Sequence, residues 1–251
     1  METLVRYEHH AAVATITLAT RAIDNALNPE AASQLDDCIR RAGEDSACRA
    51  VVIASDGPKF CTGMDLSAVA RARDGASAFA SALLRICESP KPFLAHVEGD
   101  VAAGGLGLMA ACDIVIAGRD VTLALTEAIV GMVPLLISPV LMRRLTPASF
   151  GYLALSTRHV TAAEAHNRGL VDEVCDSCSR TALNRQLDRL LHCSPGSLAR
   201  SKQIACPLDL RAQVESALLD FNRWMQQSDL LAELEAFTNG LAPSWFRKYK
   251  G

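Results

Sequence analysis

Two glycine-rich turns, each placed directly after a short apolar run, constrain this chain more than any other feature of its sequence. The first spans residues 60–66 (FCTGMDL) and the second spans residues 99–107 (GDVAAGGLG). A glycine-rich passage from a strand into a helix exposes backbone N–H groups at the positive end of the helix. Two such turns facing each other would bind a developing oxyanion, although glycine in either turn alone equally suits tight packing. Neither turn matches the G-x-G-x-x-G or P-loop patterns that bind nucleotides.

Short apolar strands alternate with helical segments around these turns, which is the pattern of an α/β domain. A helix is expected to start at Asn28-Pro29, where a capping side chain precedes proline at the first helical position. Thr161 and Glu164 have the spacing of a capping box, so a further helix is expected there. The first two strands are expected at residues 4–7 and 13–18, on either side of a His-His turn. Further strands are expected at 50–55, 93–97, 114–117, 122–125 and 170–174.

The last quarter of the chain is expected to be wholly helical. The apolar side chains on the face of one such helix are Leu210, Val214, Ala217, Leu218, Phe221 and Met225, at near-ideal helical spacing. The Ser194-Pro195-Gly196 sequence is a natural hinge before this part. Since 251 residues can form one large domain with an appendage, the sequence predicts a core at 1–193 and a helical region at 194–251.

Composition excludes several classes of function. Half of the residues are hydrophobic, the net charge is −3, and no basic stripe is present, so a nucleic-acid partner is not expected. The N-terminal sequence lacks a cationic stretch followed by a long apolar run, and no apolar run is long enough to span a bilayer. A cytoplasmic protein without a membrane partner is expected. The closing sequence Trp245-Phe246-Arg247-Lys248 suits either docking of a partner or terminal packing.

Cysteine usage points to neither a disulfide framework nor a metal. The nine cysteines are scattered and odd in number, so reduced and mostly buried thiols are expected. Cys175 and Cys178 form a C-x-x-C pair, but no second pair or histidines at ligand spacing accompany them. We therefore expect no metal and no redox cofactor.

Several blocks of sequence, in the same order along the chain, resemble the crotonase (enoyl-CoA hydratase/isomerase) superfamily. The resemblance covers most of the chain and implies a crotonase fold, a ββα spiral core of the α/β class with C-terminal helices. These helices commonly form the interface of a homotrimer or hexamer in this superfamily. The matching blocks are NAL at 25–27, AVVIASDGPKFCTGMDL at 50–66, KPFLAHVEGDVAAGGLGLMAACDIVIA at 91–117, LALTEAIVGMVP at 123–134 and TAAEAHNRGLVDEV at 161–174, with Ser194-Pro195 and Lys202 beyond them.

The resemblance implies roles for residues at the matched positions. The backbone N–H groups of Met64 and Gly104 are implied to form an oxyanion hole for a thioester enolate, and Glu127 is implied to be the catalytic acid/base. Hydratases of the superfamily carry another glutamate where this chain has Gly107, so hydration by two carboxylates is disfavoured. The sequence also lacks the superfamily's P-G-x-G-G after the acid, and reads Pro134-Leu135-Leu136-Ile137-Ser138 instead. An apolar wall beside the acyl group is expected there.

Four further positions are candidates for the site. Asp65 is a candidate catalytic group, with capping of a short helix from Leu66 as the alternative. His96 is a candidate ligand of a substrate carboxylate, with an internally hydrogen-bonded strand histidine as the alternative. Gly105 and Leu135 are expected to contact the acyl group.

One branch of the superfamily fits these features best. The A-G-G-L-G turn without the extra glutamate, with Glu127 and His96 present, is similar to dehydratases of polyketide β-branching cassettes. That likeness implies removal of water from 3-hydroxy-3-methylglutaryl-acyl carrier protein to give the 3-methylglutaconyl thioester. The substrate would be a phosphopantetheine thioester on acyl carrier protein or CoA, without another cofactor. An isomerase or hydratase of CoA esters, and an inactive crotonase-fold scaffold, remain as alternatives.

Overall fold

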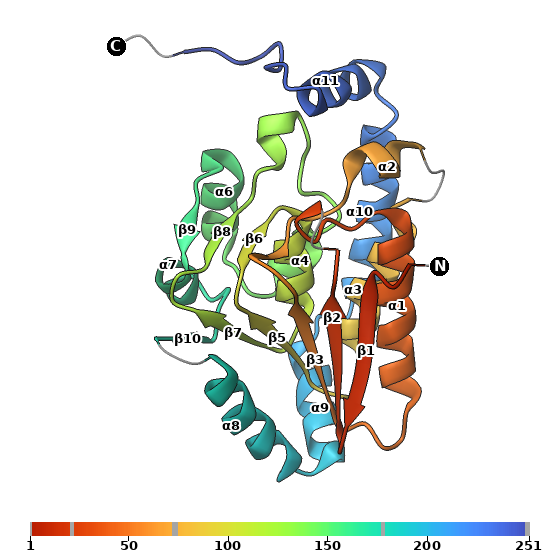
Figure 1. The fold of residues 1–251 in the computed structure, drawn as a ribbon, viewed down its shortest axis with the longest axis vertical. Helices are drawn as coiled ribbons and strands as arrows, with labels where there is room; N and C mark the ends of the chain where they lie inside the picture. The colour runs from red at the N-terminus through yellow and green to blue at the C-terminus, as the bar shows by residue number, and fades with distance from the viewer. Residues whose placement is uncertain (1, 21–22, 72–74, 177–178, 249–251) are drawn as a thin grey trace.

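A computed structural model describes residues 2–20, 23–71, 75–176 and 179–248 of the chain (Figure 1). Its larger sheet has six strands in the order β1-β2-β3-β5-β7-β10. Strands β1 and β2 pair antiparallel, and every later neighbour in this sheet pairs parallel. The strands are β1 (Val5–His10), β2 (Val13–Leu18), β3 (Ala50–Ser55), β5 (Phe93–Val97), β7 (Ile114–Gly118) and β10 (Glu173–Cys175).

A smaller sheet of short strands lies at the end of the larger one. Its order is β4-β6-β8-β9, with β4, β6 and β8 parallel and β9 antiparallel to β8. Strands β3, β5 and β7 are each followed by one of these short strands and then by helical structure, so the chain winds as the expected ββα spiral. The short strands are β4 (Lys59–Cys61), β6 (Asp100–Ala102), β8 (Thr122–Ala124) and β9 (Val160–Thr161).

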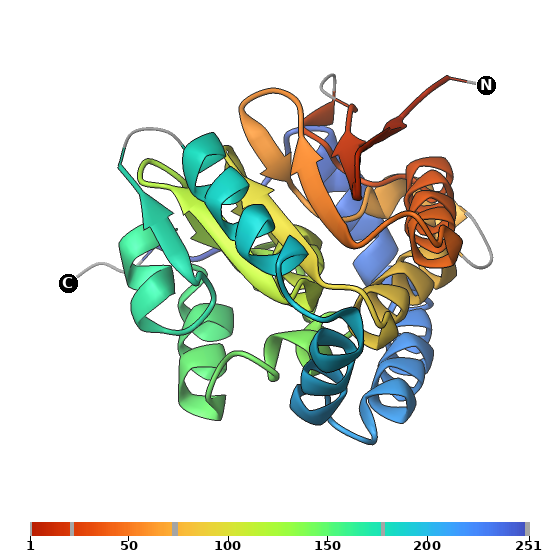
Figure 2. The ribbon, with the colours of Figure 1, turned by 90° about the horizontal axis from the view of Figure 1, so that it is seen from below.

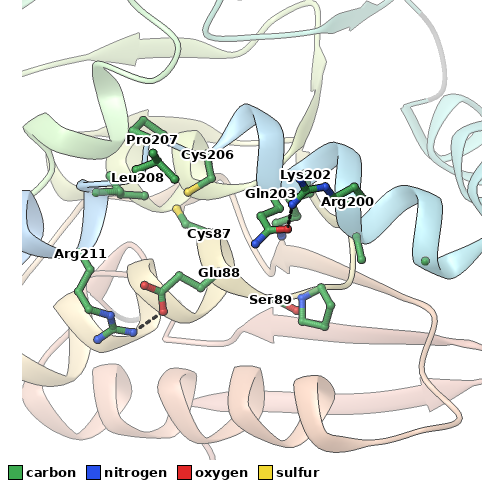
Figure 3. A pocket seen from close by; sticks show the side chains of 14 residues that line it. Cys87, Glu88, Ser89, Arg200, Lys202, Gln203, Cys206, Pro207, Leu208 and Arg211 are labelled. Carbon is green, nitrogen blue, oxygen red and sulfur yellow. Dashed lines mark hydrogen bonds and ion pairs between the residues drawn. The ribbon is translucent and has the colours of Figure 1, made fainter.

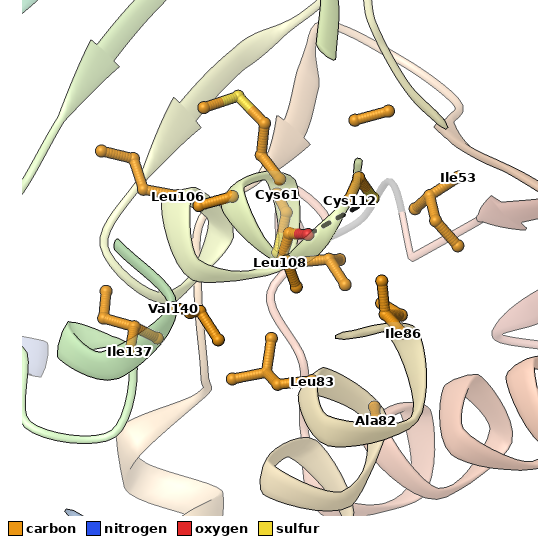
Figure 4. Close-up of a cluster of buried hydrophobic side chains, with 14 of the residues drawn as sticks. Ile53, Cys61, Ala82, Leu83, Ile86, Leu106, Leu108, Cys112, Ile137 and Val140 are labelled. Atoms are coloured by element: carbon orange, nitrogen blue, oxygen red, sulfur yellow. Dashed lines mark hydrogen bonds between the residues drawn. The ribbon is translucent and has the colours of Figure 1, made fainter. Parts of the chain in front are cut away.

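Helices cover both faces of the larger sheet (Figure 2). Helix α8 packs on one face over a small apolar cluster, whereas α1, α3 and α4 pack on the other face over the main core. Helix α4 is buried along its whole length and lies in the centre of that core (Figure 4). The helices named here are α1 (Pro29–Glu44), α3 (Ser77–Glu88), α4 (Gly104–Ala111) and α8 (Ser179–Leu191).

The remaining helical elements surround the two ends of the core. Helix α10 packs against α3 and α5 and contributes Leu210, Val214 and Phe221 to the main core. The predicted division at residue 193 stays a prediction. These elements are α2 (Leu66–Arg71), the 3-10 helix η2 (Glu127–Val130), α5 (Ser138–Leu141), α6 (Pro147–Ser156), α7 (Ala162–Asn167), α9 (Pro195–Ala205), α10 (Leu210–Trp224) and α11 (Ser228–Thr238).

Local sequence signals explain most of these element boundaries, and two expectations are wrong in detail. Asn28 accepts a hydrogen bond from Ala31 N at 2.8 Å, so it caps α1 as its side chain predicts. The first turn lies at Ala11, whose φ is 52°, because strand β1 continues through the His-His pair. The predicted strand 170–174 begins only at Glu173, and Asp172 just before it bonds β7 twice, since its N donates to Val115 O at 2.9 Å and its carboxylate accepts from Val115 N at 2.7 Å.

The described ranges contain eight of the nine cysteines and all of the helices named above. Cys178 lies outside the described residues, so the C-x-x-C pair is not described as a unit. No helix within those ranges is long and apolar enough to cross a membrane. The free thiols include Cys38, Cys48, Cys61, Cys87, Cys112, Cys193 and Cys206.

Candidate active site

A cavity of about 150 Å³ lies where the two glycine-rich turns meet the segment that follows β8. Both predicted oxyanion donors, Met64 and Gly104, line it together with Glu127. The structure therefore brings together three residues that are far apart in the sequence. The other lining residues are Thr62, Leu66, Ala103, Thr126, Val130, Met132, Val133, Pro134, Leu135, Leu136, Ile137 and Phe221.

The two turns are in direct contact through their glycines. A Cβ atom on Gly63 would lie 2.7 Å from Gly104 N, and one on Gly104 would lie 3.5 Å from Met64 N. Gly63 also has a φ of +93°, which residues with a side chain rarely adopt. These glycines allow the two backbone N–H groups to lie side by side. Among the residues that the structure describes, neither N–H has a hydrogen-bond acceptor.

Ala103 holds the second of these amides in place with a strained backbone. Its φ of 46° and ψ of −125° are unusual for a residue with a Cβ atom, and such conformations cost about 1–3 kcal/mol. The strain is compensated by fixed contacts, because Ala103 N donates to Ala124 O at 2.9 Å and Leu106 N donates to Ala103 O at 2.9 Å. The same peptide leads directly into Gly104, the first residue of α4. Unpaired amides at a helix start suit stabilisation of a developing negative charge.

Glu127 is placed by the short 3-10 helix η2 and is mostly buried at the cavity. Its Oε2 atom is buried and has no hydrogen-bond partner among the described residues. Burial raises the pKa of Glu127 to about 7, and the backbone amides of Glu127 and Thr126 oppose that rise. A carboxyl group with a pKa near neutral can both accept and donate a proton at physiological pH.

The space of the missing glutamate is filled by a neighbouring side chain. A Cβ atom on Gly107 would lie 2.2 Å from Ile137 Cγ2 and 2.6 Å from Ile137 Cβ. Figure 4 shows Ile137 beside α4, from which a side chain at position 107 would project. The cavity is therefore lined by a single carboxyl group, Glu127, among the residues that the structure describes. Neither Gly107 nor Ile137 can be replaced by a larger residue without movement of the other.

The predicted apolar wall is present, and one of its members was not predicted. Leu135 lines the cavity as expected, together with Pro134, Leu136 and Ile137. Phe221 reaches the cavity from α10, although the sequence marks it only as one member of that helix's apolar face. Helical periodicity shows which face of α10 is buried, but it does not show what that face meets.

Gly105 is placed differently from its neighbour. It is absent from the described lining of the cavity, and a Cβ atom there would lie 2.2 Å from Cys61 O. Gly105 thus permits α4 to pack closely on β4, and its contact with substrate stays a prediction. Asp65 also lies outside that lining, and its Oδ1 accepts from Ala68 N at 3.0 Å. Of its two expected roles, the structure shows helix capping.

His96 faces away from the cavity. It lies on β5 on the same face as Leu94, which packs against α8, whereas Phe93 and Ala95 face the main core. Its imidazole is 2% exposed and its Nε2 lies 2.9 Å from Ser179 Oγ. Burial is also the main cause of a lowered pKa for His96. The structure does not bring His96 to this cavity, because the alternation of the strand directs its side chain to the opposite face, and its contact with substrate stays a prediction.

The outer surface of α3, α9 and α10 carries a larger hollow of about 580 Å³ (Figure 3). Its cations already have partners: Arg211 pairs with Glu88, and Lys202 pairs with Asp113 at 2.7 Å. Arg200 donates to Gln203 within the same helix. The carboxyl group in the described lining of this hollow, Glu88, is exposed and paired with Arg211, whereas Glu127 in the smaller cavity is mostly buried, so we assign the chemistry to the smaller one.

Comparisons with known proteins agree with this geometry. Residues 8–239 match the family model described as enoyl-CoA hydratase/isomerase. The chain is 30% identical over 214 residues to the bacillaene synthase dehydratase PksH of Bacillus subtilis, covering 82% of this chain and 81% of that protein. It is 27% identical to a carnitinyl-CoA dehydratase of Proteus mirabilis, covering 88% of this chain and 90% of that protein.

Solved structures show the same fold. A crystal structure of an enoyl-CoA hydratase from Mycobacterium avium paratuberculosis has a TM-score of 0.88 and 32% identity, covering 97% of this chain and all of that one. The crystal structure of PksH from Bacillus subtilis has a TM-score of 0.85 and covers 95% of this chain and 98% of that one. At 23% identity the latter comparison supports the fold alone.

Proposed function

The chain belongs to the enoyl-CoA hydratase/isomerase family, and from that premise we propose that it is a dehydratase that acts on a 3-hydroxyacyl thioester. One observation carries the proposal: among the described residues, two backbone amides without acceptors and a single, mostly buried carboxyl group line the same largely apolar cavity. This arrangement provides an anion-binding pair and one acid/base, which is the minimum that dehydration through an enolate requires.

The first step is removal of a proton from the α-carbon. The thioester oxygen accepts hydrogen bonds from Met64 N–H and Gly104 N–H, and the Glu127 carboxylate takes the α-proton. Negative charge then develops on the thioester oxygen, where the two amides stabilise the enolate. Loss of one such donor costs on the order of 3 kcal/mol in barrier height. The apolar surroundings strengthen these interactions because they exclude water.

The second step uses the same glutamate as an acid. Protonated Glu127 gives its proton to the β-hydroxyl group, the β-carbon–oxygen bond breaks, and the enolate electrons form the new double bond. Water leaves and the carboxylate is restored, so protons and electrons balance without another reactant. A pKa near 7 suits both halves of this cycle, since neither protonation state is strongly disfavoured at neutral pH.

We further propose that the acyl group is 3-hydroxy-3-methylglutaryl on an acyl carrier protein and that the product is the 3-methylglutaconyl thioester. The resemblance to β-branching dehydratases and the similarity to PksH support this substrate. The described lining of the cavity holds the hydroxyl groups of Thr62 and Thr126 but no lysine or arginine. Because the Thr62 hydroxyl already donates to Asp24 O at 3.1 Å, the distal carboxylate is expected to accept a hydrogen bond from the Thr126 hydroxyl or to face the open mouth.

The test is mass spectrometry of four thioesters incubated with the protein. They are 3-hydroxy-3-methylglutaryl and 3-hydroxybutanoyl groups, each on acyl carrier protein and on CoA. Loss of one water from the 3-hydroxy-3-methylglutaryl carrier, faster than from the other three, is the expected result. Equal rates on CoA would refute the carrier assignment, and preference for 3-hydroxybutanoyl would refute the branched substrate. Binding without any turnover would favour the scaffold.

A double-bond isomerase is the second candidate, and the single carboxyl group is the observation that favours it. Moving a proton between two carbons of an enolate needs one acid/base and no activated water. A 1,2-epoxyphenylacetyl-CoA isomerase of Escherichia coli is 28% identical over 73% of this chain. Conversion of a 3-enoyl thioester to its 2-enoyl isomer, without loss or gain of water, would identify this activity.

We also propose that the protein assembles as a homotrimer or hexamer through its C-terminal helices. Helices α9 and α10 and the turn between them expose large apolar side chains, including Ile204 at 73%, Leu208 at 104% and Leu219 at 59% of their full accessible area. Exposed apolar side chains of this size are typical of protein interfaces. Light scattering coupled to size-exclusion chromatography is expected to give three or six times the mass of the chain, and a monomer would refute the assembly.

A further inference from the structure

Both tryptophans of the chain bind the short turn that carries Glu127. Trp224 Nε1 donates to Gly131 O at 3.1 Å, and Trp245 Nε1 donates to Ile129 O at 3.3 Å. The two indoles come from different elements, because Trp224 ends α10 and Trp245 lies beyond α11. Their acceptors are carbonyl groups at the C-terminal end of η2, where a helix leaves its carbonyls without internal partners. The turn is thus hydrogen-bonded from two directions.

Packing reinforces these hydrogen bonds at Gly131. A Cβ atom on this residue would lie 2.8 Å from Trp245 Cη2 and 3.1 Å from Leu230 Cδ1. Its φ is +74°, which allows the chain to leave η2 and return toward the cavity. Within the turn, Met132 N donates to Glu127 O at 2.9 Å. The contact with Trp245 therefore lies on the same closed loop that fixes the backbone of Glu127.

The C-terminal segment is itself held in the orientation that these contacts need. Leu230 and Leu234 anchor α11 in the main core, and α11 also contacts α2 and η2. Ser244 N donates to Glu233 Oε2 at 3.0 Å, which ties the segment after α11 back to that helix. Figure 1 shows α11 and the segment beyond it lying across the end of the molecule near α2. Trp245 therefore contacts η2 from a segment that α11 holds in place.

We infer that Trp224 and Trp245 are positioning residues, which clamp the η2 turn and so hold the Glu127 carboxyl group at the two oxyanion amides. On this inference Trp245, in the closing sequence that suits either partner docking or terminal packing, is part of the machinery that orients the acid/base. The inference rests on the proposed role of Glu127 as that acid/base. It adds that these two tryptophans act on the chemistry by fixing one turn rather than by touching substrate.

The test uses the full-length protein and the variants Trp224→Phe and Trp245→Phe, which remove the indole N–H but keep an aromatic ring. Phe246→Leu is the matched control, because Phe246 is the exposed neighbour of Trp245. Amide hydrogen exchange is measured for residues 127–132, and the carboxyl pKa of Glu127 is followed by NMR, with Glu127→Gln to assign its signal. Neither measurement depends on the identity of the substrate. The kcat and KM of thioester turnover are measured in parallel.

Both tryptophan variants are expected to exchange the amides of residues 127–132 faster than the wild type. Their Glu127 pKa should fall toward its ordinary range as water gains access, while kcat falls about fivefold for each lost hydrogen bond and KM stays nearly constant. The control should match the wild type in all four properties. Unchanged exchange and unchanged Glu127 pKa in both tryptophan variants would overturn the clamp. Changed exchange and pKa in a protein that dehydrates none of the tested thioesters would leave the clamp standing and refute the proposed reaction.

Discussion

Ile137 occupies the space that a side chain at position 107 would need, and this contact gives a prediction about the stability of the protein. Replacing Gly107 with Ala introduces a Cβ atom that would lie 2.2 Å from Ile137 Cγ2 and 2.6 Å from Ile137 Cβ. Both distances are well below van der Waals contact, and both residues are buried. Overpacking of this kind costs about 1–3 kcal/mol in the free energy of unfolding.

The companion variant Ile137→Ala removes Cγ2, the nearer of the two obstructing atoms, and keeps Cβ. Alone, it is expected to lower the free energy of unfolding by about 2 kcal/mol, at the low end for such truncations because Ile137 borders a cavity. In the double variant the new Cβ atom at 107 no longer meets Cγ2 but would still lie 2.6 Å from the Cβ atom of residue 137, so the overpacking cost falls without disappearing. The double variant should then be about 1 kcal/mol more stable than the sum of the two single effects predicts.

The assay is equilibrium urea unfolding of the wild type, both single variants and the double variant, followed by circular dichroism. Additive effects of Gly107→Ala and Ile137→Ala, with no coupling beyond about 0.5 kcal/mol, would refute the conclusion that Ile137 occupies the space of a side chain at position 107.

Three further predictions concern the pH dependence of stability, the oxyanion turn and the buried histidine. Because the pKa of Glu127 is raised from 4.5 to about 7 in the folded protein, the unfolded chain loses this proton first as pH rises, so stability should fall by on the order of 3 kcal/mol between pH 4.5 and 7. Glu127→Gln should remove that fall in urea unfolding at several pH values, and an unchanged pH profile would contradict the burial of its carboxyl group. Gly63→Ala should lower kcat at least tenfold, because a Cβ atom 2.7 Å from Gly104 N must displace one oxyanion amide; rates equal to the wild type would contradict this geometry. His96→Phe should lower thermal stability while KM changes less than twofold, whereas a large rise in KM would restore His96 as a substrate ligand.

The fold, and the set of candidate site residues that meet at one cavity, could be predicted from the sequence because ordered blocks of residues carry both. Met64, Gly104 and Glu127 are separated widely along the chain, yet each belongs to a motif whose position in the ββα spiral is fixed. The apolar wall at Leu135 was also predicted, because an unbroken run of apolar residues follows the expected acid in the sequence.

Features that depend on the direction of a side chain, or on contacts between residues far apart in the chain, could not be predicted from the sequence. His96 looks identical in sequence whether it faces the cavity or α8, and a one-residue change of strand phase decides between them. The packing of Gly105 on Cys61 and of Ile137 against Gly107 arises from contacts between separate elements. The three-residue strands β4 and β6 are too short to show periodicity. The binding of Trp224 and Trp245 to one turn likewise has no local signal.

The most direct test of the proposed chemistry follows the α-hydrogens of the substrate. 3-Hydroxy-3-methylglutaryl-acyl carrier protein carrying deuterium at the α-carbon is incubated with the wild type and with Glu127→Gln, and both deuterium loss and water loss are followed by mass spectrometry. We predict that the wild type removes α-deuterium and water together, and that Glu127→Gln, folded to the same extent, removes neither. Deuterium loss at the wild-type rate in Glu127→Gln would contradict the assignment of Glu127 as the base that forms the enolate.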